Sequence, residues 1–358
     1  MPQINDTFAQ FSVLFVLLAG IAYVVALVAF TWDLVQNGRT TASVTARSEA
    51  AAAARPRVAV AAGSGSAARS DDDVAGPEGR AERPSSAGAA VAGTADDSMK
   101  YGSERRVAAR VAVAVMTIGA LIHVAAVVLR GLAAGRVPWG NMYEFCTTGG
   151  AVVAVIFLIV LTRRDLRFLG TFVVGLVLVM ITAASVSFWT PAGHLVPALQ
   201  SYWLVIHVSI AVMSASLFTL TFAMSVLQLL QSRREGALAA GRHDGMPFLR
   251  IVPSALSLEN LAYRINAIAF VGWTLTLMFG AIWAEKAWGR FWGWDTKEVW
   301  TFVIWVVYAG YLHARATRGW TGTRAAWLSI VGYLCVVFNF TIVNLYFSGL
   351  HSYAGVAH

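Results

Sequence analysis

Three tryptophans and an aspartate lie within eight residues near the C-terminus, between two long apolar stretches. They are Trp288, Trp292, Trp294 and Asp295 in the segment WGRFWGWD. Gly289 and Gly293 remove side-chain bulk and permit tight turns, so large rings can crowd one surface. A single tryptophan near a membrane end is best explained by the preference of indole for the headgroup region. Three at this spacing favour a surface that holds a flat ligand.

Three histidines can be placed on the same side of the membrane as this loop. His207 lies about one and a half turns into a predicted helix, at ~1.5 Å of rise per residue. His351 follows the last predicted helix by a few residues, and His194 lies in a loop. A histidine at a helix end is more often solvated than a ligand, but haem iron takes one imidazole on each face of the porphyrin. We therefore predict an outer haem site with His207 and His351 as axial ligands beneath the tryptophans.

The composition places these residues in a membrane protein. Of the 358 residues, 58% are hydrophobic and 13% are charged, which is too apolar for a water-soluble globule. Eight stretches have the ~20 apolar residues that a helix needs to cross a bilayer. They lie at about 8–30, 107–132, 145–161, 168–189, 203–230, 266–285, 297–313 and 325–347. The predicted fold is an all-α polytopic membrane protein with about eight transmembrane helices.

The distribution of arginine orients the predicted helices, because short cytoplasmic loops collect Lys and Arg. Arginines follow the third, fifth and seventh spans, at Arg163, Arg164, Arg167, Arg233, Arg234, Arg242, Arg250, Arg315, Arg318 and Arg324. Both termini and the tryptophan loop are therefore expected on the outer face. The formal charge of +8 mostly records this bias, so we predict no nucleic-acid partner.

Composition also divides the chain into three segments. Residues 1–35 are predicted to form an N-terminal transmembrane helix, and residues 107–358 a seven-helix haem-handling membrane domain. Between them, residues 36–106 are rich in Ala, Gly, Ser and Arg and lack apolar periodicity, so we predict a disordered cytoplasmic linker. The chain has no CxxCH, which excludes a c-type cytochrome.

Further polar residues could serve the same chemistry. His313 lies ~25 Å along the seventh span, and ionisable groups at that depth usually have a function, although a helix end that meets water is the alternative. His123 is predicted in the outer half of the membrane, so a second ligand for haem at His313 would come from another polypeptide. Five basic residues could pair with haem propionates or with lipid headgroups. They are Arg130, Arg136, Lys286, Arg290 and Lys297.

Two carboxylates in this set also have a structural explanation. Asp295 and Glu298 have the spacing of a capping box that opens the seventh span, and Asn141 and Glu144 repeat the pattern before the third. Glu144 and Asp295 are therefore candidate site residues that could equally be helix caps.

Several ordered motifs together resemble one family. They are Pro138-Trp-Gly-Asn-Met-Tyr-Glu144, Leu199-Gln-Ser-Tyr-Trp-Leu-Val-Ile-His207, Ala281-Ile-Trp-Ala through Trp300, Tyr311-Leu-His313 and Gly349-Leu-His351-Ser-Tyr353. From about residue 107 to 358 the chain resembles the haem-handling subunit of System II cytochrome c synthases, the CcsA or ResC type with a WWD signature. The resemblance implies that His207 and His351 are paired external axial ligands, that His313 belongs to an intramembrane haem site, and that residues 288–295 form the external platform.

The resemblance also implies a reaction and partners. Haem b would be moved to the outer face and attached to the CxxCH of an apocytochrome c, with a ResB- or CcsB-type membrane partner, as one subunit of a haem lyase in a bacterial plasma membrane. The family commonly has proline after the signature aspartate, where this chain has Thr296. Three alternatives remain: a b-type haem electron carrier, a WWD-type haem-delivery protein of another pathway, and a transporter of something other than haem.

Overall fold

A computed structural model describes residues 4–53, 99 and 106–351 of the chain. All regular elements in these ranges are helices, which confirms the all-α prediction. The long helices are α1 (Asp6–Ala53), α2 (Val107–Ala134), α3 (Met142–Leu161), α4 (Gly170–Ser187), α5 (Tyr202–Ala239), α6 (Ala255–Trp288), α7 (Thr296–Arg318), α8 (Thr323–Phe340) and the short α9 (Ile342–Tyr346). Three 3-10 turns are η1 (Arg167–Leu169), η2 (Pro197–Leu199) and η3 (Pro247–Ile251).

Seven helical stretches within the described ranges are long and apolar enough to cross a membrane, close to the eight predicted. The chain is an integral membrane protein. The predicted span not among these seven is the seventh, 297–313, which corresponds to α7, a 23-residue helix that is less apolar than the others. α1 continues to Ala53, past the predicted boundary at residue 35. The rest of the predicted linker, residues 54–98 and 100–105, lies outside the described residues.

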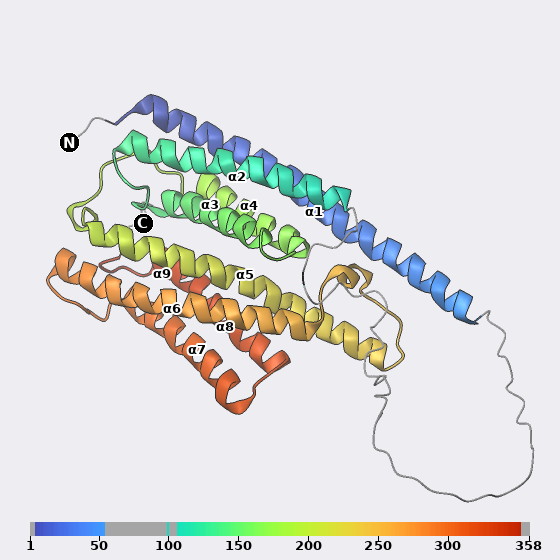
Figure 1. Ribbon diagram of the computed structural model, residues 1–358. Coiled ribbons are helices and arrows are strands. Elements are labelled where there is room, and N and C mark those ends of the chain that lie inside the picture. Colours follow the sequence, from blue (N-terminus) through green and yellow to red (C-terminus); the bar gives the residue numbers. More distant parts are fainter. Residues whose placement is uncertain (1–3, 54–98, 100–105, 352–358) are drawn as a thin grey trace, which may run out of the picture.

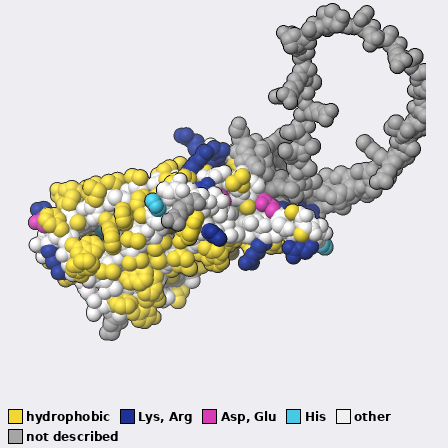
Figure 2. Space-filling view, turned by 90° about the horizontal axis from the view of Figure 1, so that it is seen from below, with side chains coloured by type: hydrophobic (Ala, Val, Ile, Leu, Met, Phe, Trp, Pro, Cys, Tyr) yellow, Lys and Arg dark blue, Asp and Glu magenta, His cyan; other side chains and the backbone are white. Residues whose placement is uncertain are grey.

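The helices pack as antiparallel pairs, α1 with α2, α3 with α4, α5 with α6 and α7 with α8 (Figure 1). One core cluster is formed by α1, α2, α3 and α4 together with the C-terminal half of α5. A second is formed by α5, α6, α7 and α8 around Trp273 and Tyr308. Hydrophobic side chains cover much of the flank of the bundle (Figure 2). Such a surface suits contact with lipid. The helices pair their own backbone N–H and C=O groups, so these groups need no water there.

The two ends of the bundle differ. At one end, called the site end below, α1, α3, α5 and α7 begin and α2, α4, α6 and α8 finish (Figure 1). Contacts at this end join distant parts of the chain: the Asn5 amide donates to the Ala133 carbonyl at 3.0 Å. The predicted cytoplasmic arginines lie at or near the opposite end, where Arg234 and Arg250 pair with Asp244.

Candidate functional site

His207 lies in the second turn of α5, and its ring is fixed by a neighbouring helix. Its Nδ1 is 2.9 Å from the carbonyl oxygen of Thr276 in α6. Because a carbonyl only accepts, Nδ1 must carry the proton, and the lone pair of a neutral ring is then on Nε2. Gly280 permits this approach, since a Cβ at that position would lie 2.7 Å from the His207 Cε1 atom. Helix packing therefore sets both the position and the tautomer of His207.

His351 follows α9 and is held by a carboxylate. Its Nδ1 is 2.7 Å from Oδ2 of Asp295, and the Leu350 amide donates to Oδ1 at 3.1 Å. The hydrogen bond from His351 lowers the pKa of Asp295, so the group is a carboxylate at neutral pH. A carboxylate that accepts from Nδ1–H leaves Nε2 of the imidazole for a metal. Ser352 and Tyr353, the rest of the predicted terminal motif, lie outside the described residues.

Asp295 is also the N-cap of α7, as predicted. Its carboxylate accepts from the Lys297 amide at 3.3 Å, and Glu298 accepts from the Asp295 amide at 3.1 Å, which completes a capping box. The cap forms with Thr296 as the first helical residue. A single carboxylate thus links the start of α7 to His351. The predicted cap is present, and a role of Asp295 in a ligand site stays a prediction.

The indoles nearest the histidines come from α6. Trp283 stacks against His207, with ring centroids 5.9 Å apart and an interplanar angle of 12°, and its ring is 5.5 Å from that of His351. Trp288 meets His351 edge to face at 4.9 Å. α6 extends to Trp288, three residues past the predicted end, so Trp288 is helical and the loop comprises residues 289–295. Trp283 was not among the predicted site residues, because one tryptophan inside a predicted span suggests packing.

The other two signature tryptophans lie farther out. Trp292 is partly exposed and lines the cavity described below, whereas Trp294 is 76% exposed and does not line it. Trp294 has a φ of +59°, and its ring meets Trp292 edge to face at 5.8 Å. A platform role for these two residues stays a prediction.

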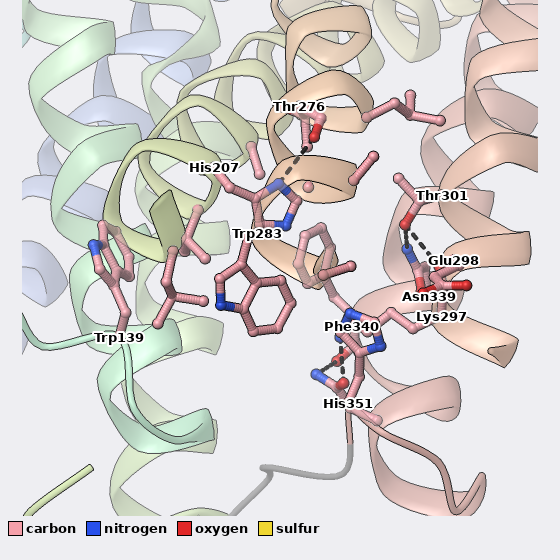
Figure 3. Close-up of a pocket in the computed structure, with 18 of the residues that line it drawn as sticks. Trp139, His207, Thr276, Trp283, Lys297, Glu298, Thr301, Asn339, Phe340 and His351 are labelled. Atoms are coloured by element: carbon pink, nitrogen blue, oxygen red, sulfur yellow. Dashed lines mark hydrogen bonds between the residues drawn. The ribbon is translucent and has the colours of Figure 1, made fainter. Parts of the chain in front are cut away.

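A cavity of about 160 Å³ lies between these residues at the site end (Figure 3). His207 and His351 both line it, with Trp139, Trp283 and Trp292. Two of the residues that line it have a buried polar atom without a hydrogen-bond partner among the described residues, Nε1 of Trp139 and Oδ1 of Asn339. A cavity of this size matches one that holds a small aromatic ring such as benzene. A porphyrin is larger than this cavity, so it would fit only if the lining opened farther.

The five basic residues predicted from the sequence have three kinds of surroundings. Arg130 and Arg136 both bind the buried carboxylate of Glu144, at 3.0 and 2.7 Å. Glu144 also accepts from the Gly140 amide at 2.8 Å, so the cluster ties α2 to the start of α3. Lys286 pairs with its neighbour Glu285, and the exposed Arg290 packs over Gly293. Only Lys297 of the five lines the cavity within the described part of the chain.

The part of the chain that contains the cavity matches a known protein family. A family model described as Cytochrome C assembly protein matches residues 139–351, from Trp139 to His351. The chain belongs to the cytochrome c assembly protein family. The match begins and ends at residues that line the cavity, so the family region contains the whole site.

Curated relatives of this family member are cytochrome c biogenesis proteins CcsA. The chain is 37% identical over 259 residues to CcsA of Prochlorococcus marinus (strain MIT 9313), covering 65% of this chain and 80% of that protein. It is 34% identical over 275 residues to CcsA of Synechococcus sp. (strain RCC307), covering 70% and 87%. For CcsA of Porphyra purpurea the identity is 33% over 263 residues, covering 64% and 82%. The predicted relation to the CcsA type, and with it a role in cytochrome c biogenesis, is confirmed.

The remaining predicted histidines do not join the cavity. His123 is fully buried in the half of the bundle formed by α1, α2, α3 and α4. Its Nδ1 is 3.4 Å from the hydroxyl of Tyr23, and its Nε2 has no hydrogen-bond partner in the described part of the chain. His313 is exposed on α7, toward the arginine-rich end. His194 is exposed in the loop between α4 and α5. No group of three or more His, Cys, Asp or Glu side chains within the described ranges could hold a bare metal ion.

Proposed function

We propose that this chain binds haem b as a substrate between His207 and His351 and presents it for covalent attachment to an apocytochrome c. One observation carries the proposal. Two imidazoles from sequence positions 144 residues apart line one cavity, and each has its Nδ1 directed at an acceptor that is not the ligand. That arrangement leaves Nε2 of both rings for iron, the pattern of histidines that ligate a metal.

The lining suits a porphyrin chemically and must adjust to its size. Trp139, Trp283 and Trp292 offer flat apolar faces, and Trp283 neighbours both imidazoles. Haem is a substrate that enters and leaves, so side chains of the lining must shift to admit it. Attachment adds each cysteine S–H of the CxxCH segment across one haem vinyl group: the sulfur bonds to one vinyl carbon and the hydrogen to the other. The addition consumes no electrons, and the substrate's own histidine then replaces one axial imidazole.

The proposal includes a partner and an orientation. The arginine-rich end would face the cytoplasm by the positive-inside rule, which puts the cavity on the outer face of a bacterial plasma membrane. A ResB- or CcsB-type membrane protein would complete the haem lyase. His313 points out of the described bundle, so a second ligand for haem bound there would come from that partner. Haem would then pass from His313 to the outer pair.

The test replaces both outer ligands. In the purified protein, His207→Ala combined with His351→Ala should abolish the Soret and α bands of a haem with two imidazole ligands. In cells, the same double variant should stop covalent haem attachment to c-type cytochromes. His194→Ala is the matched control, since His194 is exposed at the same end and does not line the cavity. Normal cytochrome c maturation in the double variant would refute the assignment.

A further inference from the structure

Lys297 places a cation inside the cavity. It is the second residue of α7, and its ammonium donates a hydrogen bond to Oδ1 of Asn344 and lies 5.3 Å from the centre of the Phe340 ring. It is the sole Lys or Arg among the described residues that line the cavity. Figure 3 shows Lys297 beside His351 and Glu298 on one wall.

The carboxylates near Lys297 are engaged elsewhere. Asp295 accepts hydrogen bonds from His351 and from the Leu350 amide. Glu298 accepts from the amides of Gly293, at 2.8 Å, and Asp295. None of the ion pairs found in the described ranges includes Lys297. The cavity wall therefore carries a basic amine that no carboxylate of the described residues contacts directly.

Helix stability does not explain a lysine at this position. The N-terminus of a helix carries a partial positive charge, so a cation in the first turn is unfavourable. Removing an ammonium from water without an anionic partner costs still more. An anionic group on a bound ligand would offset both effects. The position of Lys297 in the wall thus indicates that the ligand of this cavity carries a carboxylate or an equivalent anion, which would hold the amine in its charged form.

We propose that Lys297 binds a propionate carboxylate of the haem substrate and so selects a porphyrin that carries free acid groups. This proposal rests on the proposed function, because it takes haem as the ligand of the cavity. The other predicted basic residues are less suited: Arg130 and Arg136 are held by Glu144, and Lys286 is paired and 59% exposed. Lys297 is a positioning residue, which orients the porphyrin while the histidines hold the iron.

Haem and its dimethyl ester separate the charge contact from the iron contact. Both would be titrated into the purified full-length protein in detergent, with binding followed by the Soret band. Lys297→Met should weaken binding of free-acid haem about 10- to 100-fold, the loss expected for a charge-assisted hydrogen bond. The same variant should bind the dimethyl ester as tightly as the parent does, and Lys297→Arg should recover most of the binding of free-acid haem.

Two results would overturn the proposal. Equal losses for haem and its ester would show that Lys297 only shapes the cavity, and no loss for either would show that it does not contact the ligand. Lys286→Met is the matched control, because it removes an exposed cation at the same end. In either case an unchanged bis-imidazole spectrum in Lys297→Met would leave the proposed function standing. Absence of that spectrum from the parent protein would instead count against the proposed function.

Discussion

Gly280 offers a direct test of how helix packing positions a ligand. In Gly280→Ala the new Cβ would lie 2.7 Å from Cε1 and 2.9 Å from Nδ1 of His207. Ordinary contacts begin at about 3.4 Å, so the imidazole must retreat by about 0.7 Å or α5 must separate from α6. The ring is the more mobile of the two. We therefore expect the substitution to displace His207 while α6 stays helical.

The displacement is large relative to the hydrogen bond that orients the ring. His207 Nδ1 is 2.9 Å from the Thr276 carbonyl, and a shift of about 0.7 Å takes this contact beyond the range of a hydrogen bond. Loss of an orienting partner typically lowers metal affinity by about 10- to 100-fold. Haem affinity should fall by that factor. Stability should fall by about 1–3 kcal/mol, the usual cost of overpacking a close contact.

A haem titration of purified Gly280→Ala protein measures the effect, with thermal unfolding recorded in parallel. Gly310→Ala is the control, because Gly310 is also helical and a Cβ there would meet nothing within 4 Å. The control should be neutral or slightly stabilising, since alanine favours helix over glycine by about 1 kcal/mol. Unchanged haem affinity in Gly280→Ala would refute the view that this contact sets the position of His207.

Two further predictions concern carboxylates. Asp295→Asn keeps a good N-cap but removes the negative charge beside His351, so haem affinity should fall about 10- to 100-fold with little change in the unfolding temperature; an equal affinity would contradict the ligand-orienting role. Burial raises the pKa of Asp244, but hydrogen bonds from Arg234 and Arg250 outweigh that effect and lower it to about 2. Asp244 therefore stabilises the fold above its ordinary pKa of 3.8, and the stabilisation is lost as pH falls through about 2. Asp244→Asn should lower the free energy of unfolding by about 3 kcal/mol at neutral pH. Thermal unfolding should show that this difference between variant and parent disappears in acid; a difference that does not change with pH would exclude the charge pair as its cause.

Much of the fold could be predicted because each helix carries its own signal. Apolar length gave the spans, and the spacing of Asp295 and Glu298 gave the start of α7. Helix ends were less accurate. The apolar stretch was predicted to end at residue 285, next to Glu285 and Lys286, whereas α6 continues to Trp288 and is capped by Gly289 with a φ of +71°. Charged residues are tolerated in a last helical turn at a membrane surface, so charge marks the membrane boundary and glycine marks the helix end.

The site could be predicted in outline for a different reason. Topology alone places His207 and His351 at one end of the bundle, but the partner of each ring depends on contacts between helices. The Thr276 carbonyl meets His207 only in one register of α5 against α6, and no residue type indicates a main-chain acceptor. Trp283 was missed for the same reason, since its two histidine contacts come from other segments. Sequence spacing reports local geometry, and the site is built from non-local geometry.

The two imidazoles are oriented by unlike means, and this difference argues for a ligand site rather than for packing. A main-chain carbonyl fixes His207, and a carboxylate that also caps α7 fixes His351. A buried imidazole needs a hydrogen-bond partner in any role, but packing would not require both rings to use the same nitrogen. Both hydrogen bonds nevertheless occupy Nδ1 and so leave the same atom, Nε2, on each ring. The arrangement has a physical purpose if one metal must be held from two sides, which is the requirement that haem iron imposes.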